Sequence, residues 1–279
     1  MDVYISMLME GVAGVVAAAQ VDDAAAGRSY RSAKGLMTRE ANAAVAGAIT
    51  AGAQRIIVND GHGRMRNLDL ETLDPRVECS LGYPKPFGAM AGITNRFGAC
   101  CLVGYHGGAG SAPAILDHTL SPRMFRAVRV NGVRQTETTL NAALAGHHGV
   151  PVVMVSGDEA TCAEAIAALG PQVQTVATKA AFGAGAAYCL HPSVARERIE
   201  TAVHEGLSRA IGGDVEPYRL TPPYVLECDT ASTLAADYAS TIPGVERTAG
   251  RTLRFAADDY TTVFRALLTM SMLGELARP

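Results

Sequence analysis

The chain has 279 residues, 48% of them hydrophobic and 18% charged, and carries a formal net charge of −3 at pH 7. A chain of this length can bury one large α/β domain, or a main domain with a smaller lobe. The slight negative charge excludes the extended basic surface that nucleic acids and anionic membranes require, so we expect neither as a partner.

The beginning of the chain does not resemble a targeting segment. It lacks a basic stretch, and Asp2 and Glu10 interrupt its apolar residues, so we expect no signal peptide. No apolar run is long enough to span a bilayer. The six cysteines include no Cys-x-x-Cys pair and are expected to be reduced thiols. These features predict a cytoplasmic protein.

The first predicted strand runs from Val3 to Met9 and ends on an acidic residue followed by a glycine. Because a strand alternates its side chains between two faces, Ser6, Leu8 and Glu10 share one side. A carboxylate at the end of a buried strand is costly unless a partner requires it there. Glu10 could equally cap a helix or pair with an arginine.

Strands and helices alternate along most of the remaining chain. Residues 22–34 are predicted to form a loop, and Asn131-Gly132 is predicted to form the turn of a hairpin. Further strands are predicted at 55–59, 77–81, 98–105, 152–156, 173–179 and 224–228, with a possible pair at 246–248 and 252–256. Helices are predicted at 36–52, 137–149, 158–169, 192–211, 233–240 and 259–276.

This alternation indicates an α/β fold with a largely parallel or mixed sheet flanked by helices. We divide the chain into a main α/β domain at residues 1–190, which would hold the functional site, and a smaller C-terminal lobe of helices and strands at 191–279. The two parts could also form one continuous domain.

Polar residues follow three of the predicted strands. Glu10 ends the first, Asp60 and His62 follow the second, and His106 follows the strand at 98–105. Ligands of open α/β sheets bind beyond the carboxyl ends of the strands. Glu137 could join them from the start of a helix. Imidazole nitrogens and carboxylate oxygens suit zinc, although each residue alone could be a capping acid or a hydrogen-bonded loop histidine.

Two further features allow more than one interpretation. Lys179 follows a predicted strand and could reach a substrate carboxylate, or could be a solvated lysine. Gly183-Ala184-Gly185 resembles part of a dinucleotide-binding loop, but Tyr188 stands where the third glycine should be. With no phosphate loop in the sequence, we set aside a nucleotide-binding function.

Several short motifs, in this order over nearly the whole chain, resemble those of the zinc-dependent D-aminopeptidase family of metallopeptidases. Besides His118, they are Tyr4-x-Ser6-x-x-Met9-Glu10-Gly11, Val58-Asn59-Asp60-x-His62, Gly104-Tyr105-His106, Glu137-x-x-Leu140-Asn141, Val150-Pro151-Val152-x-Met154-Val155-x-Gly157-Asp158 and Leu220-Thr221-Pro222-Pro223. Together these motifs are specific, although none of them would be so alone.

The resemblance implies an aminopeptidase or amidase that assembles into a ring-like homo-oligomer and cleaves a small peptide or amino-acid amide next to a free amine. It implies two zinc ions, one held by Glu10 and His106 and the other by His62 and Glu137. His118 would be the catalytic histidine.

The sequence departs from the family pattern at Leu8, where the family has an aspartate that bridges both zinc ions. Two dications about 3.5 Å apart repel by roughly 19 kcal/mol at an effective dielectric constant of about 20, and a bridging anion normally offsets this. Asp60 could substitute in part. We therefore expect weaker or single zinc binding, and the alternative is a non-catalytic oligomer of the same fold that binds a small ligand or peptide.

Overall fold

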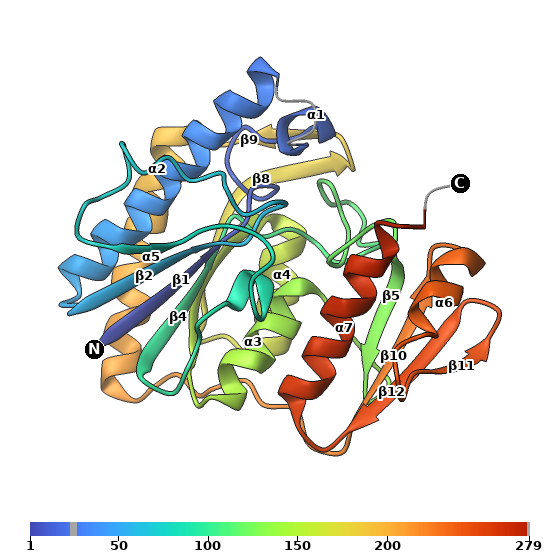
Figure 1. The fold of residues 1–279 in the computed structure, drawn as a ribbon. Coiled ribbons are helices and arrows are strands. Elements are labelled where there is room, and N and C mark those ends of the chain that lie inside the picture. Colours follow the sequence, from blue (N-terminus) through green and yellow to red (C-terminus); the bar gives the residue numbers. More distant parts are fainter. Residues whose placement is uncertain (23–26, 278–279) are drawn as a thin grey trace.

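The main sheet of the computed structural model, which describes residues 1–22 and 27–277, has seven strands. Its order is β3-β2-β1-β4-β7-β8-β9, and only β9 runs antiparallel to its neighbour (Figure 1). The strands are β1 (Asp2–Met7), β2 (Arg55–Asp60), β3 (Glu78–Ser80), β4 (Phe97–Val103), β7 (Val152–Asp158), β8 (Gln174–Gly183) and β9 (Ala186–Cys189). The predicted α/β fold with a largely parallel sheet is confirmed.

Helices cover both faces of this sheet. One face carries α2 (Arg28–Thr50) and α5 (Pro192–Gly212), with the short α1 (Ala18–Val21) beside α2. The other carries α3 (Glu137–His147), α4 (Glu159–Leu169) and the 3-10 turn η2 (Gly88–Met90). No helix in residues 1–22 and 27–277 is long and apolar enough to cross a membrane.

A second, antiparallel sheet has the order β11-β12-β10-β5-β6. It consists of β5 (Phe125–Val130), β6 (Val133–Arg134), β10 (Tyr224–Thr230), β11 (Glu246–Ala249) and β12 (Thr252–Ala257), and α6 (Thr233–Ala239) and α7 (Tyr260–Gly274) pack against it. Asn131 and Gly132 both have positive φ, 53° and 77°, as the predicted hairpin turn requires.

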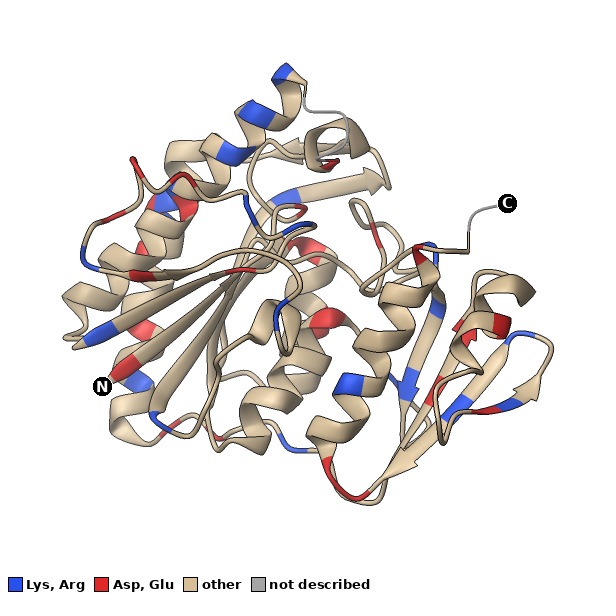
Figure 2. Ribbon diagram, viewed as in Figure 1, with Lys and Arg blue, Asp and Glu red and all other residues tan. Residues whose placement is uncertain are grey.

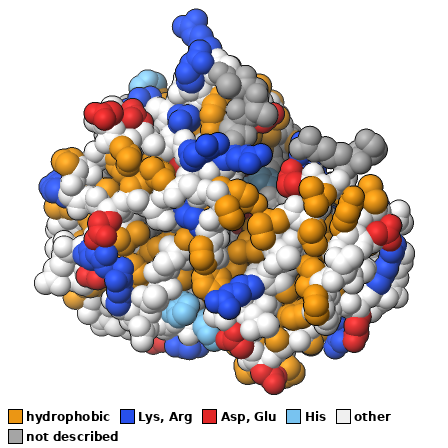
Figure 3. Space-filling view, in the orientation of Figure 1, with side chains coloured by type: hydrophobic (Ala, Val, Ile, Leu, Met, Phe, Trp, Pro, Cys, Tyr) orange, Lys and Arg blue, Asp and Glu red, His pale blue; other side chains and the backbone are white. Residues whose placement is uncertain are grey.

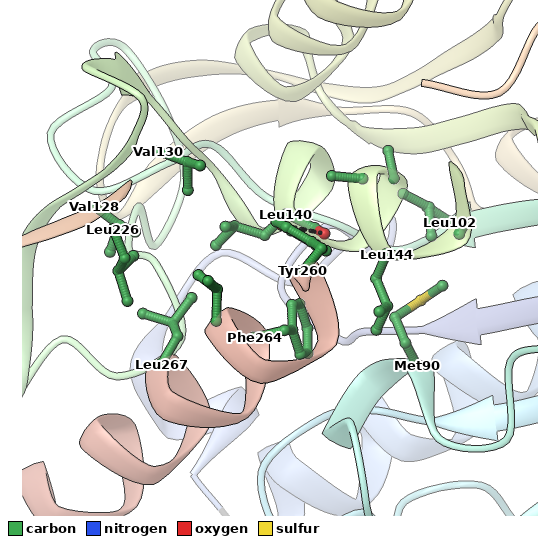
Figure 4. Packing of buried hydrophobic residues seen from close by; sticks show 14 of the residues in the cluster. Met90, Leu102, Val128, Val130, Leu140, Leu144, Leu226, Tyr260, Phe264 and Leu267 are labelled. Carbon is green, nitrogen blue, oxygen red and sulfur yellow. Dashed lines mark hydrogen bonds between the residues drawn. The ribbon is translucent and has the colours of Figure 1, made fainter. Parts of the chain in front are cut away.

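Alternate residues of β1 enter two different cores, as the period of two predicts. Val3 and Ile5 pack with residues of α2 and α5. Tyr4 and Leu8 pack in a larger cluster that also contains residues of α3, α7 and the second sheet. Figure 4 shows this cluster, in which α7 lies against α3. One continuous core therefore joins the two sheets.

The structure differs from the expected organisation in three places. The second sheet takes β5 and β6 from residues 125–134, and α5 packs on the main sheet, so a division at residue 190 does not follow the two sheets. Of the predicted loop at 22–34, residues 23–26 lie outside the described part, and α2 already begins at Arg28. Gly183-Ala184-Gly185 forms the turn between β8 and β9, an edge strand that the sequence pattern did not reveal.

Candidate metal centre

Five polar side chains converge at the carboxyl ends of β1, β2 and β4, three neighbouring strands. Glu10, His62 and His106 each follow one of these strands by two or three residues. Glu137 is the first residue of α3, and His118 lies on the loop between β4 and β5. All are buried except His118, which is partly exposed. The five residues expected from the sequence thus lie together.

The contacts among these side chains are short. Glu10 Oε1 lies 3.0 Å from His62 Nδ1, and His106 Nε2 lies 3.3 Å from Glu137 Oε1. His118 Nε2 lies 3.6 Å from Glu137 Oε1 and 3.9 Å from Glu10 Oε1. The rings of His106 and His118 stack with their centroids 3.9 Å apart. Two carboxylates therefore face three imidazoles in one small volume.

The outer nitrogen of each imidazole faces a main-chain carbonyl oxygen. His62 Nε2 lies 2.7 Å from the oxygen of Val21, His106 Nδ1 lies 3.0 Å from that of Gly107, and His118 Nδ1 lies 2.7 Å from that of Leu116. A carbonyl oxygen only accepts, so in each ring this nitrogen carries the hydrogen.

In a neutral ring, the inner nitrogen then presents a lone pair to a carboxylate, which also only accepts. Such an arrangement is repulsive unless a proton or a metal ion lies between the two groups. A positive charge between the imidazoles and the carboxylates would therefore stabilise the centre, and a bound metal ion would supply it.

Without a metal, protons supply this charge. Burial acts to lower the pKa of His62, but the charge and hydrogen bond of Glu10 outweigh it and raise the pKa to about 9. Glu137 does the same for His106, whose pKa is also raised to about 9. Burial and the neighbouring His106 lower the pKa of His118, which keeps this ring neutral near pH 7.

The carboxylates show the reciprocal effect. Burial acts to raise the pKa of Glu10, yet His62 and the other two imidazoles hold it well below its usual range. The pKa of Glu137 is likewise lowered, chiefly by His106, against the effect of burial. Both side chains are therefore anionic and could hold a cation. Nitrogen and oxygen atoms of Glu10, His106 and His118 lie within 4.8 Å of one another, a donor set and spacing that fit zinc.

Leu8 directly follows β1, which ends at Met7, and is only 3% exposed. It belongs to the apolar cluster that also contains Tyr4 and Tyr105. Leu8 is therefore part of the apolar core and offers no oxygen atom to a metal ion. The three imidazoles and two carboxylates offer enough nitrogen and oxygen donors for a zinc ion.

Asp60 does not compensate for Leu8, because its oxygens bind the loop that follows β2. Oδ1 accepts from the Asn67 side-chain amide at 2.8 Å and from the main-chain N–H of His62 at 3.3 Å. Oδ2 accepts from the main-chain N–H groups of Asn67 and Leu68. Asp60 therefore shapes the loop that carries His62.

Lys179 is buried beneath the turn after β1. Its ammonium donates to the carbonyl oxygens of Glu10, Val12 and Val15, so its hydrogens point into the protein and not toward a substrate carboxylate. Burial lowers its pKa to about 8. Nearby Glu40, which the sequence analysis did not single out, is buried on α2, and its pKa is raised to about 7 by burial. Its position among the apolar residues of α2 was the available signal.

The loop that carries His118 is held by partners that the sequence analysis also did not identify. Asp158 Oδ2 accepts from the N–H of Ile115 at 2.7 Å, and the carbonyl oxygen of Ala184, in the β8–β9 turn, accepts from the N–H of Leu116 at 3.0 Å. Because the carbonyl of Leu116 orients His118, these contacts fix the imidazole indirectly.

Comparisons with known proteins identify the family of this chain. The model of a peptidase family described as D-aminopeptidase matches residues 1–269. The D-aminopeptidase of Bacillus subtilis (strain 168) is 34% identical over 277 residues, which cover 98% of both chains. The structure of the zinc-dependent D-aminopeptidase DppA from Bacillus subtilis, described as a self-compartmentalizing protease, superposes with a TM-score of 0.91 at 33% identity, covering 99% of this chain and 98% of that one. The family resemblance and the prediction of an enzyme are confirmed: the chain belongs to the D-aminopeptidase family of peptidases.

Proposed function

We propose that this chain is a zinc-dependent hydrolase that cleaves the amide or peptide bond next to the free amine of a small peptide or amino-acid amide. The observation that carries the proposal is the set of three imidazole lone pairs directed at Glu10 and Glu137. Family membership supports it, and so does the description of DppA as zinc-dependent.

Glu10, His62, His106 and Glu137 would hold the zinc, with His118 beside them. When bound, zinc polarises a carbonyl oxygen and lowers the pKa of a coordinated water molecule toward 7. We propose one zinc per subunit, because Leu8 removes the carboxylate that would bridge two.

His118 is the proposed catalytic histidine. It is neutral near pH 7, and its Nδ1–H donates to the carbonyl of Leu116, so Nε2 is the atom that can accept a proton. Once His118 is protonated, the carboxylates of Glu137 and Glu10, 3.6 and 3.9 Å away, stabilise its charge.

The test is zinc content per subunit, measured on the parent and on Leu8→Asp, both purified without chelator, together with hydrolysis of amino-acid p-nitroanilides of both configurations. One zinc in the parent, two in Leu8→Asp, and hydrolysis by the parent support the proposal. Two zinc ions in the parent would show that the bridge is dispensable, which contradicts the single-metal site.

Leu8 also favours a second candidate, a non-catalytic oligomer that binds a small ligand or peptide in the same centre. This function requires a parent protein that holds no zinc and hydrolyses none of the amides. Recovery of zinc by Leu8→Asp would then identify the apolar side chain as the cause.

A homo-oligomer is also proposed, in accord with the description of DppA as self-compartmentalizing. The arm formed by β8 and β9 carries no charged residue from 180 to 190, as its tan colour in Figure 2 shows. Phe182 and Tyr188 on this arm are 62% and 73% exposed, and the centroids of their rings lie 4.5 Å apart. Hydrophobic side chains also gather over the middle of the face in Figure 3.

We propose that this assembly is ring-like, as the family resemblance implies. We place it in the cytoplasm because the six cysteines are free. Light scattering after size exclusion tests the assembly, and Tyr188→Lys should reduce the measured mass. Phe255→Tyr, on β12 of the second sheet, is the control that should leave the measured mass unchanged.

A further inference from the structure

The turn that carries Glu10 follows β1 but is hydrogen-bonded to β8, which lies three strands away in the main sheet. β1 and β8 are separated by β4 and β7, yet two adjacent residues of β8 reach the main chain of this turn. Thr178 Oγ1 donates to the carbonyl oxygen of Gly11 at 2.6 Å, and Lys179 Nζ donates to that of Glu10 at 2.6 Å. The turn therefore passes over the ends of β4 and β7 and is fastened at β8.

Glycines at the strand ends bring the turn into direct contact with the strands. A Cβ atom at Gly11 would lie 1.8 Å from the carbonyl oxygen of Tyr105, and one at Gly104 would lie 2.3 Å from that of Leu8. The main chain of the turn therefore packs directly on the main chain of the strand ends, with no side chain between them.

The ammonium of Lys179 organises three carbonyls of this turn. Besides Glu10, it donates to Val12 at 2.8 Å and to Val15. Glu40, which acts electrostatically on Lys179, contacts the same turn: its Oε1 accepts from the N–H of Ala13 at 2.9 Å, and its Oε2 has no hydrogen-bond partner among the described residues. A buried charge is costly, and an apolar side chain would fill the same space at lower cost.

We propose that Lys179 is a positioning residue of the metal centre, whose ammonium fixes the carbonyl of Glu10 and so directs the Glu10 carboxylate at the three imidazoles. The inference rests on the proposed function. Glu10 is where this matters most, because its Oε1 lies 3.0 Å from His62 and 3.9 Å from His118.

The experiment measures zinc affinity by chelator competition and the visible spectrum of the cobalt(II)-substituted protein. Lys179→Met keeps the length of the side chain and removes the ammonium, so we expect zinc affinity to fall about 10- to 100-fold and the cobalt spectrum to change. Val203→Ala, buried on α5 away from the centre, is the control for general destabilisation. Its zinc affinity and cobalt spectrum should equal those of the parent.

If Lys179→Met fails to fold, Thr178→Val decides, because it removes one hydroxyl contact with the same turn and no charge. Its zinc affinity should fall several-fold. A parent-like affinity and spectrum in the folded Lys179→Met variant, or in Thr178→Val when the former does not fold, overturn the positioning role. A parent that binds no zinc instead overturns the proposed function, and this inference with it.

Discussion

Two buried polar clusters share the loop that follows β2, which carries Asn67 of one cluster and His62 of the other, and they differ in how their hydrogen bonds are satisfied. In the cluster around Asp60, acceptors face donors: both carboxylate oxygens receive N–H groups, and Tyr30 Oη donates to the side-chain oxygen of Asn67. In the metal centre, the acceptors of Glu10 and Glu137 face imidazole nitrogens that are acceptors themselves unless protonated.

The difference separates a structural cluster from a ligand site. A cluster whose donors and acceptors match is complete within the protein and stabilises a loop. A cluster of facing acceptors is complete only with a cation. Burial alone does not distinguish them, since Asp60 and Glu137 are both buried.

Removing one imidazole should break the metal centre with the largest effect. His106→Ala deletes a proposed ligand and the stacking partner of His118, so zinc affinity and hydrolysis should each fall by more than about 100-fold. This loss is larger than the roughly 10- to 100-fold that is typical when only a hydrogen-bond partner of a ligand is removed. Chelator competition and amide hydrolysis measure the two effects. Cys228→Ala, a buried change in the second sheet, serves as the control, and a His106→Ala variant with parent-like affinity would contradict the ligand assignment.

The facing acceptors also predict a steep pH dependence of zinc binding. The pKa values of His62 and His106 are raised to about 9, so both rings are protonated at pH 7 without metal and must lose these protons to bind it. Zinc affinity should therefore fall as the pH drops below 9, by up to about 100-fold per pH unit for two protons. Calorimetry in buffers of different ionisation enthalpy should count about two protons released per zinc at pH 7. A count near zero would show that the imidazoles are already neutral.

Strand pattern pointed to Glu10, His62 and His106 because position along a strand fixes where a side chain emerges. Glu137 was proposed from the start of a helix, and His118 came from the family resemblance alone. Glu10, His62 and His106 follow neighbouring parallel strands, so their meeting depends mainly on the order of the sheet. Strand pattern could not separate Asp60, the last residue of β2, from the ligand candidates, and it placed Lys179 at a strand end although β8 continues to Gly183. Their partners, Asn67 and the turn after Glu10, are set by tertiary folding and leave no periodic signal.

In the secondary structure too, features set by local sequence were predicted and features set by distant contacts were not. The Asn131-Gly132 turn and most strands depend on local pattern, and they were predicted within a few residues. The start of α2 was missed because residues 28–34 are largely polar, although Tyr30 and Ala33 among them are buried on the first two turns of this long helix. Membership of β5 and β6 in the second sheet depends on pairing with β10, about 100 residues away in the chain.

A change in the satisfied cluster should affect stability more than metal binding. Asp60→Asn replaces an acceptor by a donor opposite the N–H groups of the loop, so we expect a loss of about 2–3 kcal/mol in unfolding free energy, or roughly 4–10 °C in melting temperature. Zinc affinity of the folded protein should change by less than about tenfold. Differential scanning calorimetry and chelator competition test both expectations. Asp69→Asn, exposed on the same loop, should change neither quantity, and a loss of zinc binding without a loss of stability would place Asp60 in the centre.

A third buried contact, outside both clusters, shows how small the effect of an ordinary hydrogen bond should be. Tyr260 Oη on α7 donates to the carbonyl oxygen of Leu140 on α3, at 3.1 Å, and α3 begins with Glu137. Tyr260→Phe should lower the unfolding free energy by about 1 kcal/mol and leave zinc affinity unchanged, because α3 is also held by its contacts with α4 and β7. Thermal unfolding and chelator competition measure the two quantities. A weaker zinc site in Tyr260→Phe would mean instead that α7 helps to place Glu137. The second sheet, on which α7 packs, would then be coupled to the metal centre through α7.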